Sequence, residues 1–149
     1  MVFYLRRVNI MVELIVGRKG KGKTSVLLDK VNAAVKEANG SIVYLDKNAK
    51  HMFDLSNRVR LIDCSSYPIK NSDEFVGFIC GIISQDHDLE QIYLDNFLTT
   101  ARLEGLDVTG PLQQLDAIGE KFGVKFIISV CLDETEIPAE YREKVAVSL

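Results

Sequence analysis

Several features that would assign this 149-residue chain to a special class are scarce in its sequence. It has only three prolines, no low-complexity tract and no linker-like boundary, so we expect one ordinary globular domain with a sizeable core. No run approaches the roughly 20 apolar residues that a bilayer-spanning helix needs, so no membrane span is predicted.

Excess positive charge and paired cysteines are also lacking. The net charge is −3, which predicts that no global field holds the isolated domain on nucleic acid. The cysteines at positions 64, 80 and 131 show neither CxxC pairing nor metal-ligand spacing. Because all three lie in apolar segments, we expect buried, reduced thiols and a cytoplasmic protein.

Short β-branched runs alternate with helix-like segments along the chain. The expected strands are Met11–Gly17, Ser41–Asp46, Val59–Asp63, Gln91–Asp95, Lys125–Cys131 and Lys144–Ser148. The expected helices are Lys23–Ala38, Ser72–Ser84, Pro111–Phe122 and, briefly, Pro138–Glu143, with Gly40 and Gly123 as helix stops. Continuous apolar strands separated by helices predict a mostly parallel sheet covered on both faces. We therefore expect one α/β domain over residues 11–149, preceded by an N-terminal extension, 1–10, that forms an edge strand or a tail.

Three glycines and four basic residues follow the first apolar run, in the segment "GRKGKGKT" from Gly17 to Thr24. This segment has the G-x-x-x-x-G-K-T spacing of a P-loop, or Walker A motif, and it lies between an expected strand and an expected helix. Backbone N–H groups there can surround a phosphate chain, aided by the helix dipole. Lys23 would contact the β- and γ-phosphates, and the Thr24 hydroxyl would be a Mg²⁺ ligand. The predicted nucleotide-binding residues are Gly17, Arg18, Lys19, Gly20, Lys21, Gly22, Lys23, Thr24 and Ser25.

A Walker A loop needs an acidic partner on a neighbouring strand to hold the water shell of the metal. Three aspartates end apolar strands and are candidates: Asp46, Asp95 and Asp133. In the five-stranded form of this architecture, the metal-side aspartate ends the strand after the second crossover, which favours Asp95. Asp133 is expected to cap the turn that follows it.

The order of these features resembles the RecA-like P-loop ATPases, the class of the recombinase, the replicative-helicase motor and the circadian-clock ATPase. "SIVYLDKNAK" is similar to the strand that carries the catalytic glutamate, "IYLD" to the Walker B strand and "KFIISVC" to the sensor strand. "IPAEYREKVAVSL" resembles the short helix and closing strand. The resemblance implies a three-layer P-loop NTPase fold with five strands in the order 5-1-4-3-2, numbered along the chain. It also implies ATP and Mg²⁺ as ligands.

Two positions depart from this family pattern. The catalytic glutamate, two residues beyond Asp46, is replaced by Asn48, and the residue directly after Asp95 is Asn96. Neither amide can accept a proton from water, so Asp46 is the nearest remaining carboxylate. The resemblance therefore implies a slow ATPase that an oligomeric neighbour or a partner protein completes.

Alternative functions also remain open from the sequence. A non-hydrolysing ATP-binding switch would keep the same P-loop, and a small P-loop kinase would need paired lid arginines where only Arg102 is present. The segments 97–110 and 132–143, which follow the Walker B and sensor strands, contain neither clustered cations nor stacking aromatics. We therefore expect no strong nucleic-acid binding by the isolated domain.

Overall fold

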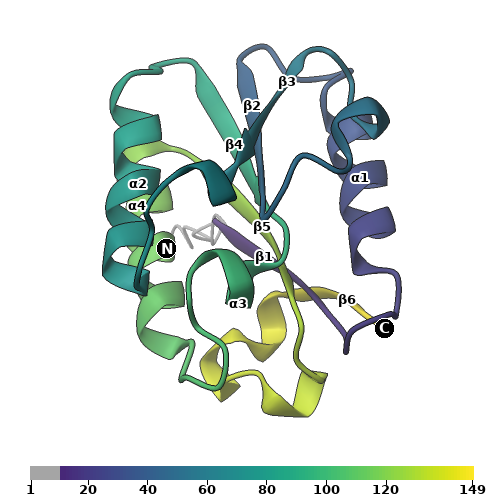
Figure 1. The fold of residues 1–149 in the computed structure, drawn as a ribbon, viewed down its shortest axis with the longest axis vertical. Helices are drawn as coiled ribbons and strands as arrows, with labels where there is room; N and C mark the ends of the chain where they lie inside the picture. The colour runs from purple at the N-terminus through teal and green to yellow at the C-terminus, as the bar shows by residue number, and fades with distance from the viewer. Residues whose placement is uncertain (1–10) are drawn as a thin grey trace, which may run out of the picture.

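Six strands of the computed structural model, which describes residues 11–149, form one all-parallel sheet (Figure 1). Their order is β3-β2-β4-β5-β1-β6. The strands are β1 Val12–Val16, β2 Ser41–Asp46, β3 Val59–Asp63, β4 Leu89–Leu94, β5 Lys125–Val130 and β6 Val145–Ser148. All six predicted strands are therefore present, and the predicted extension, 1–10, lies outside the described residues.

The predicted sheet had five strands, whereas the observed sheet has six. Without β3, the remaining strands follow the predicted order, because β6, β1, β5, β4 and β2 are neighbours in that sequence. The additional strand, Val59–Asp63, pairs with β2 at the edge of the sheet. Its pairing extends the sheet beyond the core that the family resemblance implies.

Four α-helices connect the strands: α1 Lys23–Ala34, α2 Ser72–Ser84, α3 Phe97–Thr100 and α4 Thr109–Phe122. The bounds of α2 agree with the prediction, and Asn71 caps its first turn by accepting a hydrogen bond from the Glu74 N–H at 2.9 Å. α1 ends four residues earlier than predicted, and the short α3 was not predicted. Short 3₁₀ turns occupy Met52–Asp54 (η1), Cys64–Ser66 (η2), Glu134–Glu136 (η3) and Ala139–Lys144 (η4), the last in place of the predicted α-helix.

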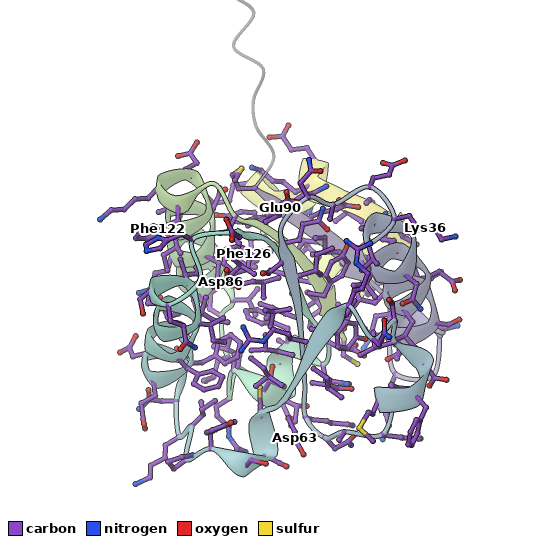
Figure 2. All side chains as sticks on the ribbon, turned by 90° about the horizontal axis from the view of Figure 1, so that it is seen from above. Lys36, Asp63, Asp86, Glu90, Phe122 and Phe126 are labelled. Atoms are coloured by element: carbon purple, nitrogen blue, oxygen red, sulfur yellow. The ribbon has the colours of Figure 1, made fainter. Side chains whose placement is uncertain are left out.

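Two apolar clusters lie on opposite faces of the sheet. α1 covers one face, where Leu27 and Val31 pack with Ile15 of β1, and α2 and α4 cover the other (Figure 1). Side chains fill both layers in Figure 2, which places Phe126 inside the domain and Lys36 at its periphery. Alternation along each strand divides the side chains between these faces, as expected for a parallel sheet that is buried on both sides.

Some local expectations are corrected by the fold. Cys64 is buried as predicted, but Cys80 and Cys131 are exposed, because one lies on the outer side of α2 and the other follows the end of β5. Gly40 does not end α1; a Cβ there would lie 1.9 Å from the Asp88 carbonyl oxygen, so glycine allows two turns to meet. Asp133 caps the 3₁₀ turn at Glu134–Glu136, as predicted.

Candidate functional site

The segment with the Walker A spacing forms the loop between β1 and α1. Gly22, the residue before the helix, has φ 95°, and Gly20 has φ 84°. A Cβ at either position would meet no atom within 4 Å, so the requirement for glycine is conformational and not one of space. The loop can therefore turn its backbone N–H groups toward one point at the start of α1.

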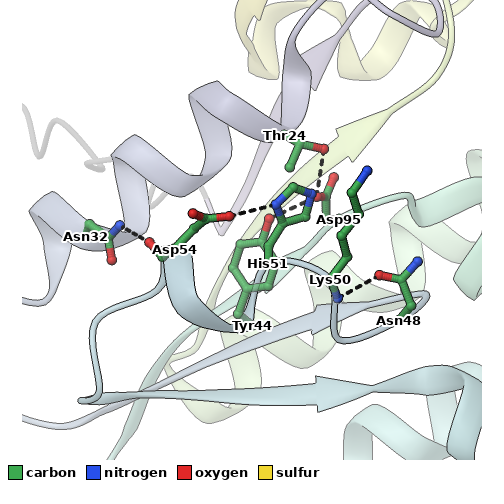
Figure 3. Close-up of polar contacts among 8 residues, drawn as sticks. All are labelled: Thr24, Asn32, Tyr44, Asn48, Lys50, His51, Asp54 and Asp95. Atoms are coloured by element: carbon green, nitrogen blue, oxygen red, sulfur yellow. Dashed lines mark hydrogen bonds and ion pairs between the residues drawn. The ribbon is translucent and has the colours of Figure 1, made fainter.

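The first two residues of α1 supply the side chains of this loop. The Lys23 ammonium donates a hydrogen bond to the Arg18 carbonyl oxygen at 3.0 Å, so its charge lies folded against its own loop. The Thr24 hydroxyl donates to Asp95 Oδ2 at 2.9 Å across 71 residues of sequence. Figure 3 shows the contact between Thr24 and Asp95, the two predicted metal-side residues. The predicted phosphate-binding lysine, Lys23, lines the same cavity as both of them.

Asp95 lies directly after β4 and is only 1% exposed. Its Oδ2 accepts hydrogen bonds from the hydroxyls of Thr24 and Tyr44, both at 2.9 Å. Its Oδ1 accepts from the Ser129 hydroxyl at 2.6 Å and from the Asn96 N–H at 2.9 Å. Four neutral donors, three hydroxyls from α1, β2 and β5 and the backbone N–H of the next residue, therefore hold this carboxylate in place.

Tyr44 and Ser129 were not recognised from the sequence as part of the site. Both lie in the middle of apolar strands and point, like Asp95, to the face that α1 covers. Burial and the charge of Asp95 raise the pKa of the Tyr44 hydroxyl, so the hydroxyl stays protonated and donates its hydrogen bond. The sequence signals that could have identified them are the hydroxyl of Tyr44, two positions before Asp46, and the serine inside "KFIISVC".

Asp46, at the end of β2, is joined to this site through Asn96. The Asn96 side-chain amide donates to Asp46 Oδ1 at 2.9 Å, and the Lys47 N–H donates to the same oxygen at 2.7 Å. Burial raises the pKa of the Asp46 carboxyl, the nearby charge of Asp95 adds to the effect, and these hydrogen bonds offset it only in part. Asp46 therefore binds a proton more readily than an ordinary aspartate does.

Two neighbouring cavities open at this edge of the sheet. The cavity beside the loop Gly17–Thr24, called the P-loop cavity below after the sequence pattern of that loop, measures about 200 Å³ and is lined by residues that include Gly20, Gly22, Lys23, Thr24, Asp95 and Asn96. Asn48 does not line that cavity; it lines a separate one of about 290 Å³, and its side-chain oxygen accepts a hydrogen bond from the Lys50 N–H at 2.9 Å (Figure 3). The structure thus brings Lys23, Thr24, Asp95 and Asn96 together around the P-loop cavity, and it places Asn48 in the neighbouring cavity.

The remaining predicted loop residues are more exposed. Lys19 lines the P-loop cavity, whereas Lys21 and Ser25 face solvent. The Arg18 guanidinium forms an ion pair with Glu136 at 2.6 Å, which connects the loop to the segment after β5. Both partners are substantially exposed, so this pair contributes less than about 1 kcal/mol to stability.

The donor set of Thr24 and Asp95 fits Mg²⁺. Both offer oxygen ligands, which this hard cation prefers, and Mg²⁺ commonly takes few protein ligands because it retains water and binds substrate phosphates. Within residues 11–149, no group of three or more His, Cys, Asp or Glu side chains is arranged to hold a metal. In that same range, no helix has both the length and the apolar character to cross a membrane.

Comparison with known proteins identifies the fold and nothing finer. No protein-family model matches the sequence, and no curated protein matches it. Among solved structures, that of C. elegans PCH-2 matches 94% of this chain with a TM-score of 0.51 and 14% identity. The chain spans about a third of the length of PCH-2, of which 34% is covered. At this identity the likeness shows a shared α/β fold alone, and it does not distinguish the RecA-like class from others.

Proposed function

We propose that this domain binds Mg·ATP at the loop Gly17–Thr24 and is a slow, RecA-like ATPase. The observation that supports the proposal best is the 2.9 Å hydrogen bond between Thr24 and Asp95, beside Lys23 in one cavity. A Walker A spacing alone predicts a phosphate loop, whereas this contact adds the metal-side pair that hydrolysis needs. Its unpaired cysteines are consistent with a cytoplasmic location.

Binding would rearrange the contacts of the chain's own residues. Lys23 would release the Arg18 carbonyl oxygen and direct its ammonium to the phosphates, where a charge-assisted contact is stronger. Thr24 would turn its hydroxyl oxygen toward the metal, while Asp95, still held by Tyr44 and Ser129, would orient the water around it. Mg²⁺, when bound, supplies charge neutralisation on the phosphates.

Slow hydrolysis follows from the choice of side chains around the cavity. Of the described residues that line it, Asp95 is the sole carboxylate, and Asn96 is an amide. Asn48 is an amide in the neighbouring cavity. General-base catalysis is typically worth about 10²–10⁴-fold, so a site without a base should turn over well below the usual enzyme range of about 1–10³ s⁻¹. An oligomeric neighbour or a partner protein would supply the missing group.

The same amides support a second candidate, a non-hydrolysing switch. In that case, the ATP-bound and ATP-free forms would differ where Lys23 leaves Arg18, since Arg18 also contacts Glu136. A steady-state phosphate-release assay separates the two candidates: the ATPase releases phosphate at a rate proportional to protein concentration, and the switch releases none.

Lys23→Ala tests the proposal directly. We expect the substitution to cost roughly 2–4 kcal/mol of Mg·ATP affinity, or about 30–1000-fold in Kd, because it removes a charged donor from a dense phosphate site. Isothermal titration calorimetry measures this loss. Lys36→Ala, which removes the same charge from an exposed position after α1, should bind as the wild type does. Equal affinity of the wild type and Lys23→Ala would overturn the assignment.

A further inference from the structure

The cavity next to the P-loop shares no lining residue with the cavity of the proposed ATP site. It measures about 290 Å³ and lies beyond the carboxyl ends of β2, β3 and β4, the edge at which open α/β sheets bind ligands. Its lining combines charged, polar and apolar side chains, among them Lys47, Asn48, Cys64, Ser65, Thr99 and Arg102. This volume is at the small end of ligand pockets, so it suits a small molecule better than a polymer.

The charge of the lining is positive. Lys47 and Arg102 are both cationic, and none of the described residues that line the cavity is a carboxylate. Three carboxylates lie nearby without lining the cavity: Asp46 accepts from the Lys47 N–H at 2.7 Å, Asp63 from the Ser65 hydroxyl at 2.6 Å, and Glu104 from the Thr99 hydroxyl at 2.9 Å. After burial, the charges of Asp46 and Asp63 contribute to the raised pKa of the Cys64 thiol. The cavity therefore presents two cations and an amide to whatever enters it, which is the chemistry of an anion site.

Arg102 is held in place by its backbone and by one hydrogen bond. Its φ of 57° lies in the left-handed region, which costs a residue with a Cβ about 1–2 kcal/mol. Its Nε donates to the Ile69 carbonyl oxygen at 3.0 Å, which leaves the two terminal nitrogens of the guanidinium for a ligand. Such a strained and anchored arginine points to a function, because strain of this kind accumulates at binding sites.

We propose that this cavity binds a small phosphate-bearing molecule, with the phosphate between Lys47 and Arg102. The planar guanidinium matches two phosphate oxygens, and the Asn48 amide can donate to a third. Cys64 and Ile69, both buried, offer an apolar wall for a short carbon skeleton. This inference goes beyond ATP binding and does not depend on it.

The two cavities share a connection through Asp46. Lys47 lines the cavity proposed here for a phosphate, and Asn96 lines the P-loop cavity. The Lys47 backbone N–H and the Asn96 side-chain amide both donate to Asp46 Oδ1, at 2.7 and 2.9 Å. A ligand that draws the Lys47 side chain toward its phosphate acts on the residue whose backbone N–H donates to Asp46.

A ¹H–¹⁵N NMR titration with glycerol 3-phosphate tests the proposal, because it reports each cavity separately. We expect saturable changes in the chemical shifts of the Ser65, Thr99 and Arg102 amides, independent of any change at the loop Gly17–Thr24. Lys47→Gln and Arg102→Gln should each weaken the Kd from these shifts at least about tenfold, the loss of one charge-assisted contact. Lys36→Gln, an equal charge change at an exposed site, should leave it unchanged.

Several outcomes would overturn the inference. They are shifts confined to the P-loop amides, no saturable shift at all, or a Kd that Lys47→Gln and Arg102→Gln both leave unchanged. Lys47 is exposed, so its substitution keeps the test valid even if the loss of the Arg102–Ile69 contact unfolds the other variant. A parallel titration with malonate should give at least about tenfold weaker binding, and equal binding would contradict selectivity for phosphate. Failure of Mg·ATP to shift the loop Gly17–Thr24 would contradict the proposed function and leave this inference intact.

Discussion

Two carboxylate regions on the α1 face of the sheet, one half-buried and one buried, are stabilised in opposite ways. Glu13, near the amino end of β1, forms ion pairs with Lys30 of α1 and Lys125 of β5, both at 2.8 Å. Asp46 and Asp95, at the carboxyl ends of β2 and β4, form no ion pair among the described residues and accept hydrogen bonds from neutral donors. One region carries its own countercharge, and the other does not.

The pKa values reflect this difference. Burial acts to raise the pKa of Glu13, but the hydrogen bonds and charges of Lys125 and Lys30 more than offset it, so the pKa is lowered. Burial raises the pKa of Asp46, and the charge of Asp95 raises it further. A structural carboxylate is thus neutralised within the chain, while the carboxyl edge retains negative charge that an external cation such as Mg²⁺ can neutralise.

Removing the central carboxylate should have the largest effect. Asp95→Ala leaves the hydroxyls of Thr24, Tyr44 and Ser129 without their acceptor, while the Asn96 N–H keeps the Ser129 hydroxyl oxygen at 3.0 Å. Because each buried unsatisfied donor costs about 1–3 kcal/mol and relaxation recovers part of it, we expect a loss of about 3–5 kcal/mol in the free energy of unfolding. Urea denaturation measures the loss. Glu13→Ala is the matched control and should lose much less, because Lys30 and Lys125 can reach water.

Adding a carboxylate to the same edge should accelerate hydrolysis. If the family alignment holds, Asn48→Glu installs the missing base and should raise ATP turnover at least about tenfold, with ATP affinity within roughly 1 kcal/mol of the wild type. A phosphate-release assay measures the rate. Asn96→Glu places the carboxylate in the P-loop cavity itself. A gain in ATP turnover by Asn96→Glu alone would show that the family alignment at Asn48 is wrong. If the wild type already turns over quickly and neither substitution matters, Asp46 is the next candidate for the base.

The sequence predicted most of the fold because the relevant signals are local. The apolar run of β2, Ser41–Asp46, defines its own bounds, and burial on both faces explains its lack of alternation. β3 was predicted as a strand, but its place in the sheet as a sixth strand was not. Strand pairing at the edge of a sheet depends on tertiary contacts that no local pattern encodes. The short α3 was missed because four residues are too few to show a helical period.

The site was predictable only where a motif specifies spacing. Lys23, Thr24 and Asp95 could be chosen from the Walker A pattern and strand order, and the structure brings them together. Tyr44 and Ser129 could not be chosen in this way, because the hydrogen-bond partner of a polar group inside an apolar strand depends on which strands are neighbours in the sheet. The separation of Asn48 from the P-loop cavity depends on how the chain turns after β2, where Lys50 binds the Asn48 side chain.

Removing the charge of Glu13 should have a moderate, pH-dependent effect. A lowered folded-state pKa contributes stability that is present above the unfolded value of 4.5 and lost as the pH falls through the folded value. We therefore expect Glu13→Gln to cost about 1 kcal/mol at pH 7, discounted because both lysines are partly exposed. Urea denaturation between pH 7 and pH 3 should show the cost shrinking with acid. A cost that stays constant with pH would mean that Glu13 acts through packing alone.

Asp46→Asn should have the smallest effect and the opposite sign. A raised folded-state pKa contributes stability that is present below the unfolded value and lost as the pH rises, so the wild type lacks it at pH 7. The asparagine oxygen could accept the same two hydrogen bonds from Asn96 and Lys47 without a charge to bury. We expect a gain of about 0.5–1 kcal/mol at pH 7 that disappears in acid, measured by urea denaturation. A loss at pH 7 would show that Asp46 already has a countercharge, and the contrast with Glu13 would fail.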